Sequence, residues 1–553
     1  MRLLLLLLFL LHISDARTVS EYRALLSMKS AISADSQAAL SSWKATTSHC
    51  TWVGVTCDSR RHVTSLDISG LNLYGTLSPD IMHLQFLQNL TVAANQFSGA
   101  VPLEISTLST LRFLNLSNNL FNGSFPTQLS QLANLQVLDL YNNNMTDELP
   151  VIVTQLRNLR HLDLGGNFFS GQIPAEYGRW EFLEYLAVSG NELEGKIPAE
   201  IGNLSKLREL YIGYYNSYTG GLPPEIGNLS SLVLLDAANC GLSGEIPAEI
   251  GKLQTLDTLF LHVNNLSGSL TTELGSSKSL KSMDFSNNVL TGEIPGSFAE
   301  LKNLTLLNLS RNKLHGAIPE FIGDLPQLEV LQMWENNFTG SIPQRLGSNG
   351  MLQMLDLSSN KLTGTLPPDM CSGNHLETLI TLGNFLFGPI SESLGKWSLT
   401  TELVSSKSLK SMYLMDNVLT GEIPRSFAEL KNLTRLNLCT NKLHGAIPEF
   451  IGDLPQLEAL WLRENNFTGS IPQRLGSNGM LQILDLSSNK LTGTLPPDMC
   501  SGNHLETLIT LGNFLFGTIP ESLGKCESLS RIRMGDNLSA LIAQLVCPHC
   551  FEV

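Results

Sequence analysis

A period of 24 residues organises the chain from position 63 onward. The segment LNLSNNLFNG at 114–123 returns as LDLGGNFFSG at 162–171 and as LDLSSNKLTG at 355–364. A repeat of this length cannot bury its own apolar residues, so successive repeats must stack. The length of 553 residues alone would suggest several domains. The period instead predicts one continuous repeat solenoid.

One position of each repeat is nearly invariant and serves as an anchor. The spacing is 24 residues except for one step of 25, from Asn191 to Asn216, and one of 33, from Asn384 to Asn417. This is the L-x-x-L-x-L-x-x-N-x-L pattern of the leucine-rich repeat. The anchors are Leu71, Asn95, Asn119, Asn143, Asn167, Asn191, Asn216, Cys240, Asn264, Asn288, Asn312, Asn336, Asn360, Asn384, Asn417, Asn441, Asn465, Asn489, Asn513 and Asn537.

Each part of the repeat has a predicted role. The Leu-x-Leu pair is expected to form a short strand, with its leucines inside and the intervening residues on the concave face. The anchor Asn can use its amide donors and its carbonyl on backbone groups of adjacent turns. The Gly-x-Ile-Pro segment, as at 171–174, should turn the chain onto the convex side. The predicted fold class is an α/β repeat solenoid with parallel concave-face strands.

The N-terminus predicts export. Arg2, an apolar run from Leu3 to Leu11 and small residues up to Ala16 are typical of a secretory signal peptide at 1–16; a buried N-terminal helix is the alternative. No later stretch reaches 18 apolar residues, so the chain is expected to be secreted, without direct membrane insertion. The net charge of −15 argues against nucleic acid as a partner.

Asn-x-Ser/Thr sequons agree with a secreted glycoprotein. Only 15% of the residues are charged, so glycans would supply hydrophilic cover. Two of the sequons, Asn115 and Asn308, lie between strand leucines and would place sugars on the concave face. The sequons are Asn89, Asn115, Asn122, Asn144, Asn203, Asn228, Asn265, Asn303, Asn308, Asn337, Asn432, Asn466 and Asn537.

Residues 17–62 are predicted to cap the solenoid. Thr18 and Glu21 fit a capping box that opens a helix. Cys50 and Cys57 are expected to form a disulfide in an exported chain, and no second pair of ligands nearby supports a metal site. The residues expected to share the buried face of this helix are Tyr22, Leu25, Leu26 and Ile32.

The Gly-x-Ile-Pro segments and the cysteine–tryptophan cap resemble the plant-specific class of leucine-rich repeat receptor kinases. Four phrases, at 213–223, 500–503, 508–517 and 531–537, are similar to the CLAVATA/BARELY ANY MERISTEM receptor kinases. The resemblance covers 17–537. It implies a plant-type superhelix that perceives CLE-type peptide hormones in meristem signalling, with a co-receptor leucine-rich repeat kinase as a further partner. Members of that family are single-pass plasma-membrane proteins with a cytoplasmic Ser/Thr kinase.

The chain departs from that family in an internal duplication. Residues 269–396 and 398–525 are near copies at an offset of 129, which is five repeats of 24 plus nine residues. The surplus is expected to bulge at the junction, on the convex side. A tandem duplication and an assembly error in the gene model both fit. The predicted parts are 63–396 (first part), 397–405 (junction), 406–537 (duplicated part) and 538–553 (non-repeat tail).

No catalytic site is predicted. The kinase motifs are missing from the sequence, and no nucleophile–base arrangement or cofactor motif is visible. For Cys547 and Cys550, a local disulfide or a read-through tail is favoured over a zinc site. The alternatives to a receptor ectodomain are a secreted inhibitor of the polygalacturonase-inhibitor kind, for which twenty repeats are too many, and a non-functional truncated product.

Arg531 and Arg533 are predicted to project from the concave face, with Ile532 and Met534 inside. Two guanidiniums at this spacing suit a carboxylate, and the resemblance implies that the pair holds the C-terminal carboxylate of a CLE peptide. Two solvated surface arginines are the alternative. Upstream outward positions that would hold the rest of the peptide, each of which could equally be plain surface, are His161, Asp163, Tyr185, Tyr211, Gly213, Tyr214, Phe260, His262 and Trp334.

The duplication predicts which of the remaining cysteines form a disulfide and which stay as free thiols. Cys500 and Cys526 follow the convex-side prolines of neighbouring turns and are expected to form a disulfide. The partner of the copied Cys371 would fall on Trp397, so Cys371 should remain a thiol, as should Cys240 and Cys439. Cys439, predicted on the concave face, should be the most reactive of the three if it is exposed.

Overall fold

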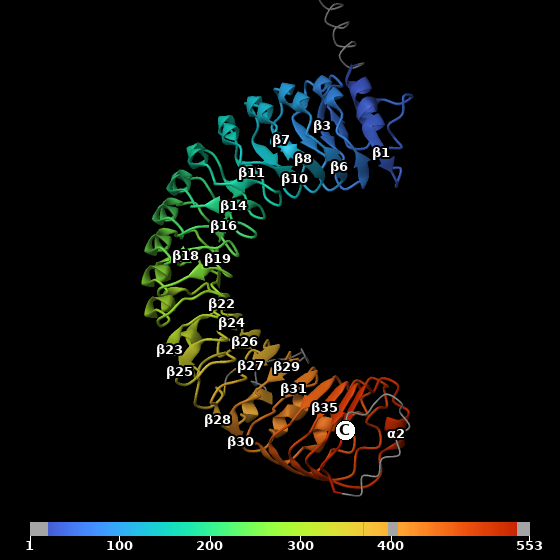
Figure 1. Ribbon diagram of the computed structural model, residues 1–553, viewed down its shortest axis with the longest axis vertical. Helices are drawn as coiled ribbons and strands as arrows, with labels where there is room; N and C mark the ends of the chain where they lie inside the picture. Colours follow the sequence, from blue (N-terminus) through green and yellow to red (C-terminus); the bar gives the residue numbers. More distant parts are fainter. Residues whose placement is uncertain (1–19, 369, 396–407, 539–553) are drawn as a thin grey trace, which may run out of the picture. The chain divides into compact units, whose positions relative to one another are not determined.

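The computed structural model describes residues 20–368, 370–395 and 408–538 (Figure 1). The predicted signal peptide, the junction at 397–405 and the tail beyond residue 538 lie outside the described residues. The chain divides into two compact units, residues 1–267 and 268–553. Both units are built from the same repeat.

A parallel sheet forms one face of each unit, the concave face (Figure 1). Its strands pair in register with those of the next repeat, so that Leu162 lies opposite Leu186, and Leu355 opposite Leu379. In the N-terminal unit the strands are β3 (Val63–Asp67), β5 (Asn89–Thr91), β7 (Phe113–Asn115), β9 (Val137–Asp139), β11 (His161–Asp163), β13 (Tyr185–Ala187), β15 (Glu209–Tyr211), β17 (Leu234–Asp236) and β19 (Thr258–Phe260). In the C-terminal unit they are β21 (Ser282–Asp284), β22 (Leu306–Asn308), β24 (Val330–Gln332), β26 (Met354–Asp356), β27 (Thr378–Ile380), β29 (Ser411–Tyr413), β31 (Arg435–Asn437), β33 (Ala459–Trp461), β35 (Ile483–Asp485), β37 (Thr507–Ile509) and β39 (Arg531–Arg533).

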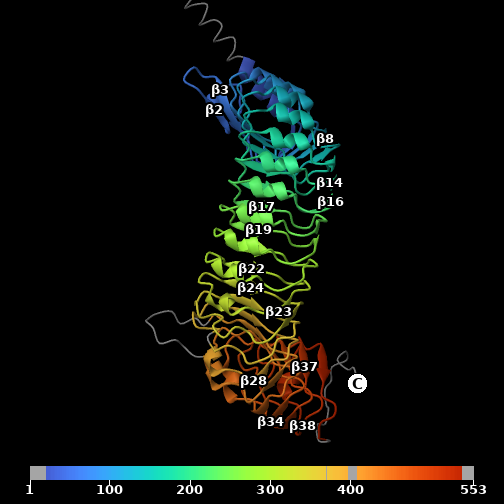
Figure 2. The same cartoon turned by 90° about the vertical axis from the view of Figure 1, so that its left-hand side faces the viewer.

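Short helices cover the opposite, convex face, stacked from repeat to repeat within each unit (Figure 2). Gly171 adopts a φ of 71°, Ile173 is buried and Pro174 precedes the helix η6, which confirms the predicted turn. The helices are 3-10 rather than α, because about five residues must cross the convex side and the 3-10 form rises further per residue. They are η2 (Pro79–His83), η3 (Leu103–Thr107), η4 (Thr127–Gln131), η5 (Val151–Gln155), η6 (Ala175–Arg179), η7 (Ala199–Asn203), η8 (Pro224–Asn228) and η9 (Ala248–Lys252), then η10 (Thr272–Ser276), η11 (Gly296–Glu300), η12 (Glu320–Asp324), η13 (Glu392–Gly395), η14 (Arg425–Glu429) and η15 (Glu449–Asp453), with the α-helical turn α2 (Glu521–Gly524).

A second set of strands follows the anchors, and the sequence did not predict it. These strands also pair in parallel between neighbouring repeats, as Asn144 does with Asn122. They are β4 (Leu73–Gly75), β6 (Gln96–Gly99), β8 (Leu120–Ser124), β10 (Asn144–Thr146), β12 (Ser170–Gly171), β14 (Glu192–Gly195), β16 (Ser217–Tyr218), β18 (Ser243–Gly244) and β20 (Asn265–Leu266), then β23 (His315–Ala317), β25 (Asn337–Thr339), β28 (Phe387–Pro389), β30 (Val418–Thr420), β32 (His444–Ala446), β34 (Asn466–Ser470), β36 (Lys490–Gly493) and β38 (Phe514–Leu515).

The anchor asparagines form the predicted ladder of buried hydrogen bonds. The Nδ2 of Asn119 donates to the carbonyls of Val92, Leu116 and Ser117 at 3.0–3.1 Å. Its Oδ1 accepts from the N–H of Phe97, in the preceding repeat, at 2.9 Å. One buried side chain therefore satisfies four backbone groups of two repeats. This bonding explains why the position tolerates so little variation.

The N-terminal cap differs from its prediction in detail. Residues 20–31 are helical, and Ile32 belongs instead to β1 (Ile32–Asp35), which pairs antiparallel with β4. Glu21 is buried, and its Oε2 accepts from the N–H of Val63 at 3.0 Å. Burial raises the pKa of the Glu21 carboxyl to about 7. Glu21 thus fixes the helix to the first repeat strand; Thr18, its expected partner in the capping box, lies outside the described residues.

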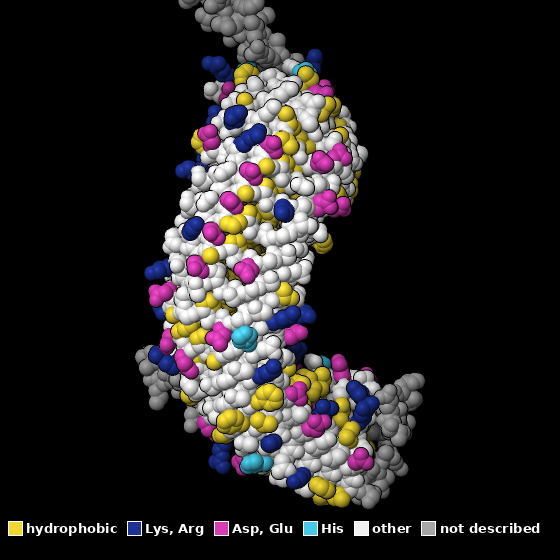
Figure 3. Space-filling view, turned by 60° about the vertical axis from the view of Figure 1, so that its left-hand side comes forward, with side chains coloured by type: hydrophobic (Ala, Val, Ile, Leu, Met, Phe, Trp, Pro, Cys, Tyr) yellow, Lys and Arg dark blue, Asp and Glu magenta, His cyan; other side chains and the backbone are white. Residues whose placement is uncertain are grey.

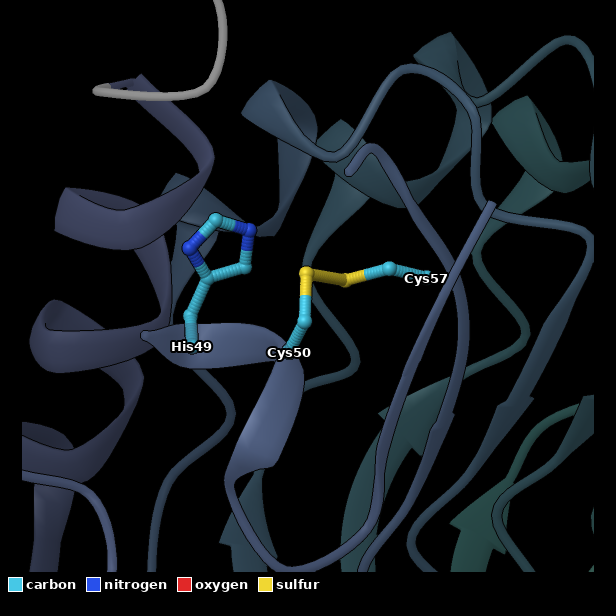
Figure 4. Close-up of side chains that lie close together, drawn as sticks. All are labelled: His49, Cys50 and Cys57. Atoms are coloured by element: carbon cyan, nitrogen blue, oxygen red, sulfur yellow. A yellow bond between two sulfur atoms is a disulfide. The ribbon is translucent and has the colours of Figure 1, made fainter. Parts of the chain in front are cut away.

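A disulfide joins Cys50, in η1 (His49–Thr51), to Cys57, in β2 (Val55–Cys57), with a Cα–Cα separation of 5.6 Å, as predicted. The His49 ring lies beside this bond (Figure 4). Because the two sulfurs are bonded to each other, they are not thiolate ligands for a metal. The strand β2 pairs antiparallel with β3, so the disulfide closes the cap onto the first repeat.

The strands keep their register across the duplication junction. Leu379 of β27 lies opposite Met412 of β29, a step of 33 residues, and the Oδ1 of Asn417 accepts from the N–H of Leu386 at 3.0 Å. On the convex side, the Glu392 carboxylate accepts from the N–H groups of Arg425 and Ser426. The surplus of nine residues must therefore fall between 395 and 408, outside the described residues.

Candidate functional site

Five aromatic and acidic side chains form one connected group on the concave face of the N-terminal unit. The rings of His161 and Tyr185 stack with centroids 4.0 Å apart, and Tyr211 follows at 5.4 Å from Tyr185. The Tyr185 hydroxyl donates to Oδ2 of Asp163 at 3.1 Å, and the Tyr211 hydroxyl donates to Oε2 of Glu209 at 3.0 Å. These side chains come from β11, β13 and β15, whose central leucines point inward.

Burial dominates the electrostatics of this group. It raises the pKa of the Asp163 carboxyl to about 7 and lowers the pKa of the His161 imidazole. It also raises the pKa of Asp236, on the neighbouring strand β17. A row of rings, with a carboxyl of raised pKa beside it, suits contact with apolar and proline-containing chain.

Four further predicted residues, Gly213, Tyr214, Phe260 and His262, lie nearby in the same unit. His262 contacts Tyr214 and Phe260 edge-on, with ring centroids 6.3 and 6.0 Å apart. Gly213 is closely packed, because a Cβ there would lie 2.4 Å from the carbonyl oxygen of Ala238. The sequence interpretation missed Glu209 and Asp236, although both occupy outward strand positions, and it missed Tyr215, which is 83% exposed.

The remaining predicted residues lie in the C-terminal unit. Trp334 is half-buried, with the Arg311 guanidinium 5.7 Å from its ring centroid. Arg531 is exposed, Arg533 is half-buried, and Ile532 between them points inward with 7% exposure. Met534, expected inside, is only half-buried. The structure thus places both guanidinium-bearing residues at outward positions of β39, beside Thr507 and Ile509 of β37.

The cysteines divide into bonded and free ones as expected. Cys500 is bonded to Cys526 with a Cα–Cα separation of 5.9 Å, and Cys240, Cys371 and Cys439 are free. The expectation for Cys439 needs correction, because it is 6% exposed and burial raises its pKa to about 12. Protonated and covered, it is a poor nucleophile.

The sequons differ in how their amide nitrogens are used. Most are exposed, as Asn466 is. The Nδ2 of Asn308 donates to Asp284, and the Nδ2 of Asn537 donates to the carbonyls of Thr510, Met534 and Gly535, because Asn537 is also an anchor. Over the face shown in Figure 3, charged side chains of both signs are dispersed among uncharged ones, in keeping with the low content of charged residues.

These bonds predict the glycan pattern. We expect Asn466 to carry a sugar in protein secreted from a plant or insect cell and Asn537 to be unmodified, because a sugar on its Nδ2 would break the last rung of the ladder. Glycopeptide mass spectrometry measures both sites in one sample. Full occupancy of Asn537 in protein whose Cys500–Cys526 disulfide is intact would contradict the expectation.

Comparisons with known proteins agree with this architecture. A family model for a leucine-rich repeat region matches residues 62–219 and 260–471, more than half of the chain, and one for the leucine-rich repeat N-terminal domain matches 20–58. The chain therefore belongs to the leucine-rich repeat family.

Solved structures identify the class within this family, that of plant receptor-kinase ectodomains. The ectodomain of the Arabidopsis receptor kinase HAESA, in complex with the peptide hormone IDA and the co-receptor SERK1, is 34% identical with a TM-score of 0.81, over 93% of this chain and 89% of that one. The plant peptide hormone receptor RGFR1, in complex with RGF2, is 32% identical with a TM-score of 0.71, over 88% of this chain and 83% of that one.

Curated relatives match over shorter stretches. The LRR receptor-like serine/threonine-protein kinase EFR of Arabidopsis thaliana is 40% identical over 85 residues, which are 15% of this chain and 8% of that protein. Among residues 20–368, 370–395 and 408–538, no helix combines the length and the apolar character needed to cross a membrane.

Proposed function

We propose that this chain is the extracellular, non-catalytic, peptide-binding region of a plant receptor kinase and that it binds a CLE-type peptide hormone on its concave face. The observation that carries the proposal is the placement of Arg531 and Arg533 at outward positions of β39. Two fork-shaped donors there can each form paired hydrogen bonds with a carboxylate. Support comes from the similar ectodomains of HAESA and RGFR1, both of which were solved in complex with peptide hormones.

The peptide would lie extended across the strands, with its free C-terminus at the arginine pair. Outward aromatic and polar side chains would contact its main chain and its prolines. A co-receptor leucine-rich repeat ectodomain is a proposed further partner, as SERK1 is in the HAESA complex. The same proposal places the chain in the secretory pathway and at the cell exterior.

Carboxylate recognition is tested with a synthetic CLE-type peptide of about 12 residues. Replacing Arg531 or Arg533 with Ala should weaken binding by about 1.5–3 kcal/mol, the range for a hydrogen bond to a charged group. Amidation of the peptide's C-terminus should have a comparable effect on the unsubstituted chain and little further effect on the double Ala variant. Calorimetry that finds equal affinities for the free-acid and amidated peptides would rule out the carboxylate assignment.

A further inference from the structure

The two copies within the C-terminal unit differ mainly on the concave face. Residues 269–396 and 398–525 differ at sixteen positions: eight of these alternate with the inward residues of the strands, and two more lie at the next residue, in the turn that follows, although Ser310, Cys439 and Ala459 among them are buried in the structure. Such positions make up only about a sixth of a repeat in this alternating geometry. The ten pairs are Asp284/Tyr413, Ser286/Met415, Asn287/Asp416, Leu306/Arg435, Ser310/Cys439, Arg311/Thr440, Val330/Ala459, Gln332/Trp461, Trp334/Arg463 and Met354/Ile483.

This distribution favours a binding role for the surface of the second copy. A stretch copied by mistake would be identical to its source, and drift without selection would spread over all positions of the repeat. Here the anchors are unchanged, and the four convex helices of the first copy, η10 to η13, differ from their counterparts at only two residues, Gly275 and Gly296. The scaffold has been retained while the exposed face has acquired a different chemistry.

Five of the new side chains form what we call the second-copy patch: Tyr413, Met415, Arg435, Trp461 and Arg463, from β29, β31 and β33 and the residues that follow them. The rings of Tyr413 and Trp461 have centroids 6.5 Å apart. Both guanidiniums are about half exposed, and each has a carboxylate within 4 Å, on Glu458 for Arg435 and on Glu464 for Arg463. Exposed ion pairs of this kind contribute little, so the arginines can pair with a ligand instead.

The second copy has gained basic side chains at these positions. Over all ten differing pairs the net charge rises from 0 in the first copy, where Asp284 and Arg311 cancel, to +1 in the second, where Arg435 and Arg463 outnumber Asp416; both of these arginines belong to the second-copy patch. A peptide that fits the patch would therefore present an acidic side chain to the arginines and apolar or proline residues to the rings.

The distance between the second-copy patch and the arginine pair at 531 and 533 also suits a single bound peptide. Three strand-to-strand steps separate β33 from β39, and five separate β29 from β39. At about 4.8 Å per step these are about 14 and 24 Å, whereas β24, which precedes Trp334, lies eight steps or about 38 Å away. An extended chain advances about 3.3–3.6 Å per residue. The second-copy patch would thus contact peptide residues that lie four to seven positions before a peptide C-terminus held at β39.

We propose that the second-copy patch is the upstream half of the peptide site in this chain. It accepts an extended peptide with a free C-terminal carboxylate and an acidic side chain about four to six residues before its end. The proposal rests on the proposed function. In it, the second-copy patch takes the place of Trp334 as the upstream contact of the peptide. Strand β31 itself carries no sequon, because Cys439 stands where the first copy has Ser310, so no N-linked sugar is expected on Asn437 of the concave face.

The first copy supplies the matched test. One variant gives the second-copy patch the first-copy residues (Arg435→Leu and Arg463→Trp), and the mirror variant makes the reverse change in the first copy (Leu306→Arg and Trp334→Arg). Each new side chain already occurs at the same repeat position in this chain, so both variants should fold, which thermal melting by circular dichroism checks. The probes are two synthetic 12-residue, proline- and glycine-containing free-acid peptides, with Asp or Asn five residues before the C-terminus.

We expect the Asp peptide to bind the unsubstituted chain at least tenfold more tightly than the Asn peptide. This preference should disappear in the second-copy variant and persist in the mirror variant. Loss of the preference in the mirror variant alone, or an unchanged preference in both variants, would overturn the inference. The proposed function would still stand in that case if peptide binding continued to depend on Arg531 and Arg533. If neither peptide binds the unsubstituted chain, both proposals fail together.

Discussion

Replacing Asn119 with Ala should lower the free energy of unfolding of the N-terminal unit by about 3–6 kcal/mol. The substitution leaves the N–H of Phe97 and the carbonyls of Val92, Leu116 and Ser117 without their side-chain partner in a buried site. An unsatisfied buried polar group costs about 1–3 kcal/mol, and carbonyls with a second partner lose less. Urea unfolding of the full chain, with hydrogen exchange at the Phe97 amide as a local probe, measures the effect.

Cys240 is the natural control for this prediction. It occupies an anchor position, but its side chain makes a single bond, from Sγ to the carbonyl of Ala237 at 3.0 Å. Cys240→Ala should therefore cost only about 1 kcal/mol, in the ordinary range for a small buried truncation. Equal costs for Asn119→Ala and Cys240→Ala would show that the ladder contributes no net stability and that leucine packing alone holds the repeats together.

Features governed by the repeat period could be predicted from the sequence. The inward leucines, the anchors, the Gly-x-Ile-Pro turn and the Cys500–Cys526 neighbourhood each follow from a spacing of about one repeat, because residues 24 apart occupy equivalent sites on adjacent turns. The strand register could be predicted for the same reason. It persists even across the 33-residue step, where Leu379 lies opposite Met412.

Contacts that do not follow from the 24-residue period could not be predicted from the sequence. Glu21 bonds to the N–H of Val63 through a packing of helix on strand that no local pattern encodes. The strands that follow the anchors went unpredicted because they have two to five residues, too few to show an alternating pattern. Cys439 occupies an outward position by its register but is covered in the structure, which reversed the expectation about its reactivity.

The candidate site likewise has features that could be predicted from the sequence and features that could not. The sequence placed the arginines and the aromatic residues at outward positions, which follows from register alone. It could not show that His161, Tyr185 and Tyr211 stack, or that the Tyr185 hydroxyl donates to Asp163, because side-chain rotamers decide those contacts. The acidic residues beside the rings, Glu209 and Asp236, needed the structure to reveal their part in this group.

Removal of the Cys500–Cys526 disulfide should destabilise the last repeats by about 3 kcal/mol. The bond closes a loop with a sequence separation of 26, for which the chain-entropy estimate is about 3–4 kcal/mol. Because each repeat contacts only its neighbours, the loss should be confined to the end of the C-terminal unit. In a Cys500→Ser/Cys526→Ser variant, we expect faster hydrogen exchange at the Arg531 amide, which donates to Glu506, and no change at the Arg435 amide, four strands earlier.

Cys371 provides the internal control for the disulfide, because it occupies the position of Cys500 in the first copy but is a free thiol. Cys371→Ser should leave exchange at β39 unchanged, and a reductant should reproduce the double-Ser result in the unsubstituted chain. Since Arg531 and Arg533 lie on the strand that this disulfide holds, the reduced protein should also lose affinity for a free-acid peptide. Unchanged exchange at β39 after reduction would mean that strand pairing alone, without the covalent bond, keeps the arginine pair in place.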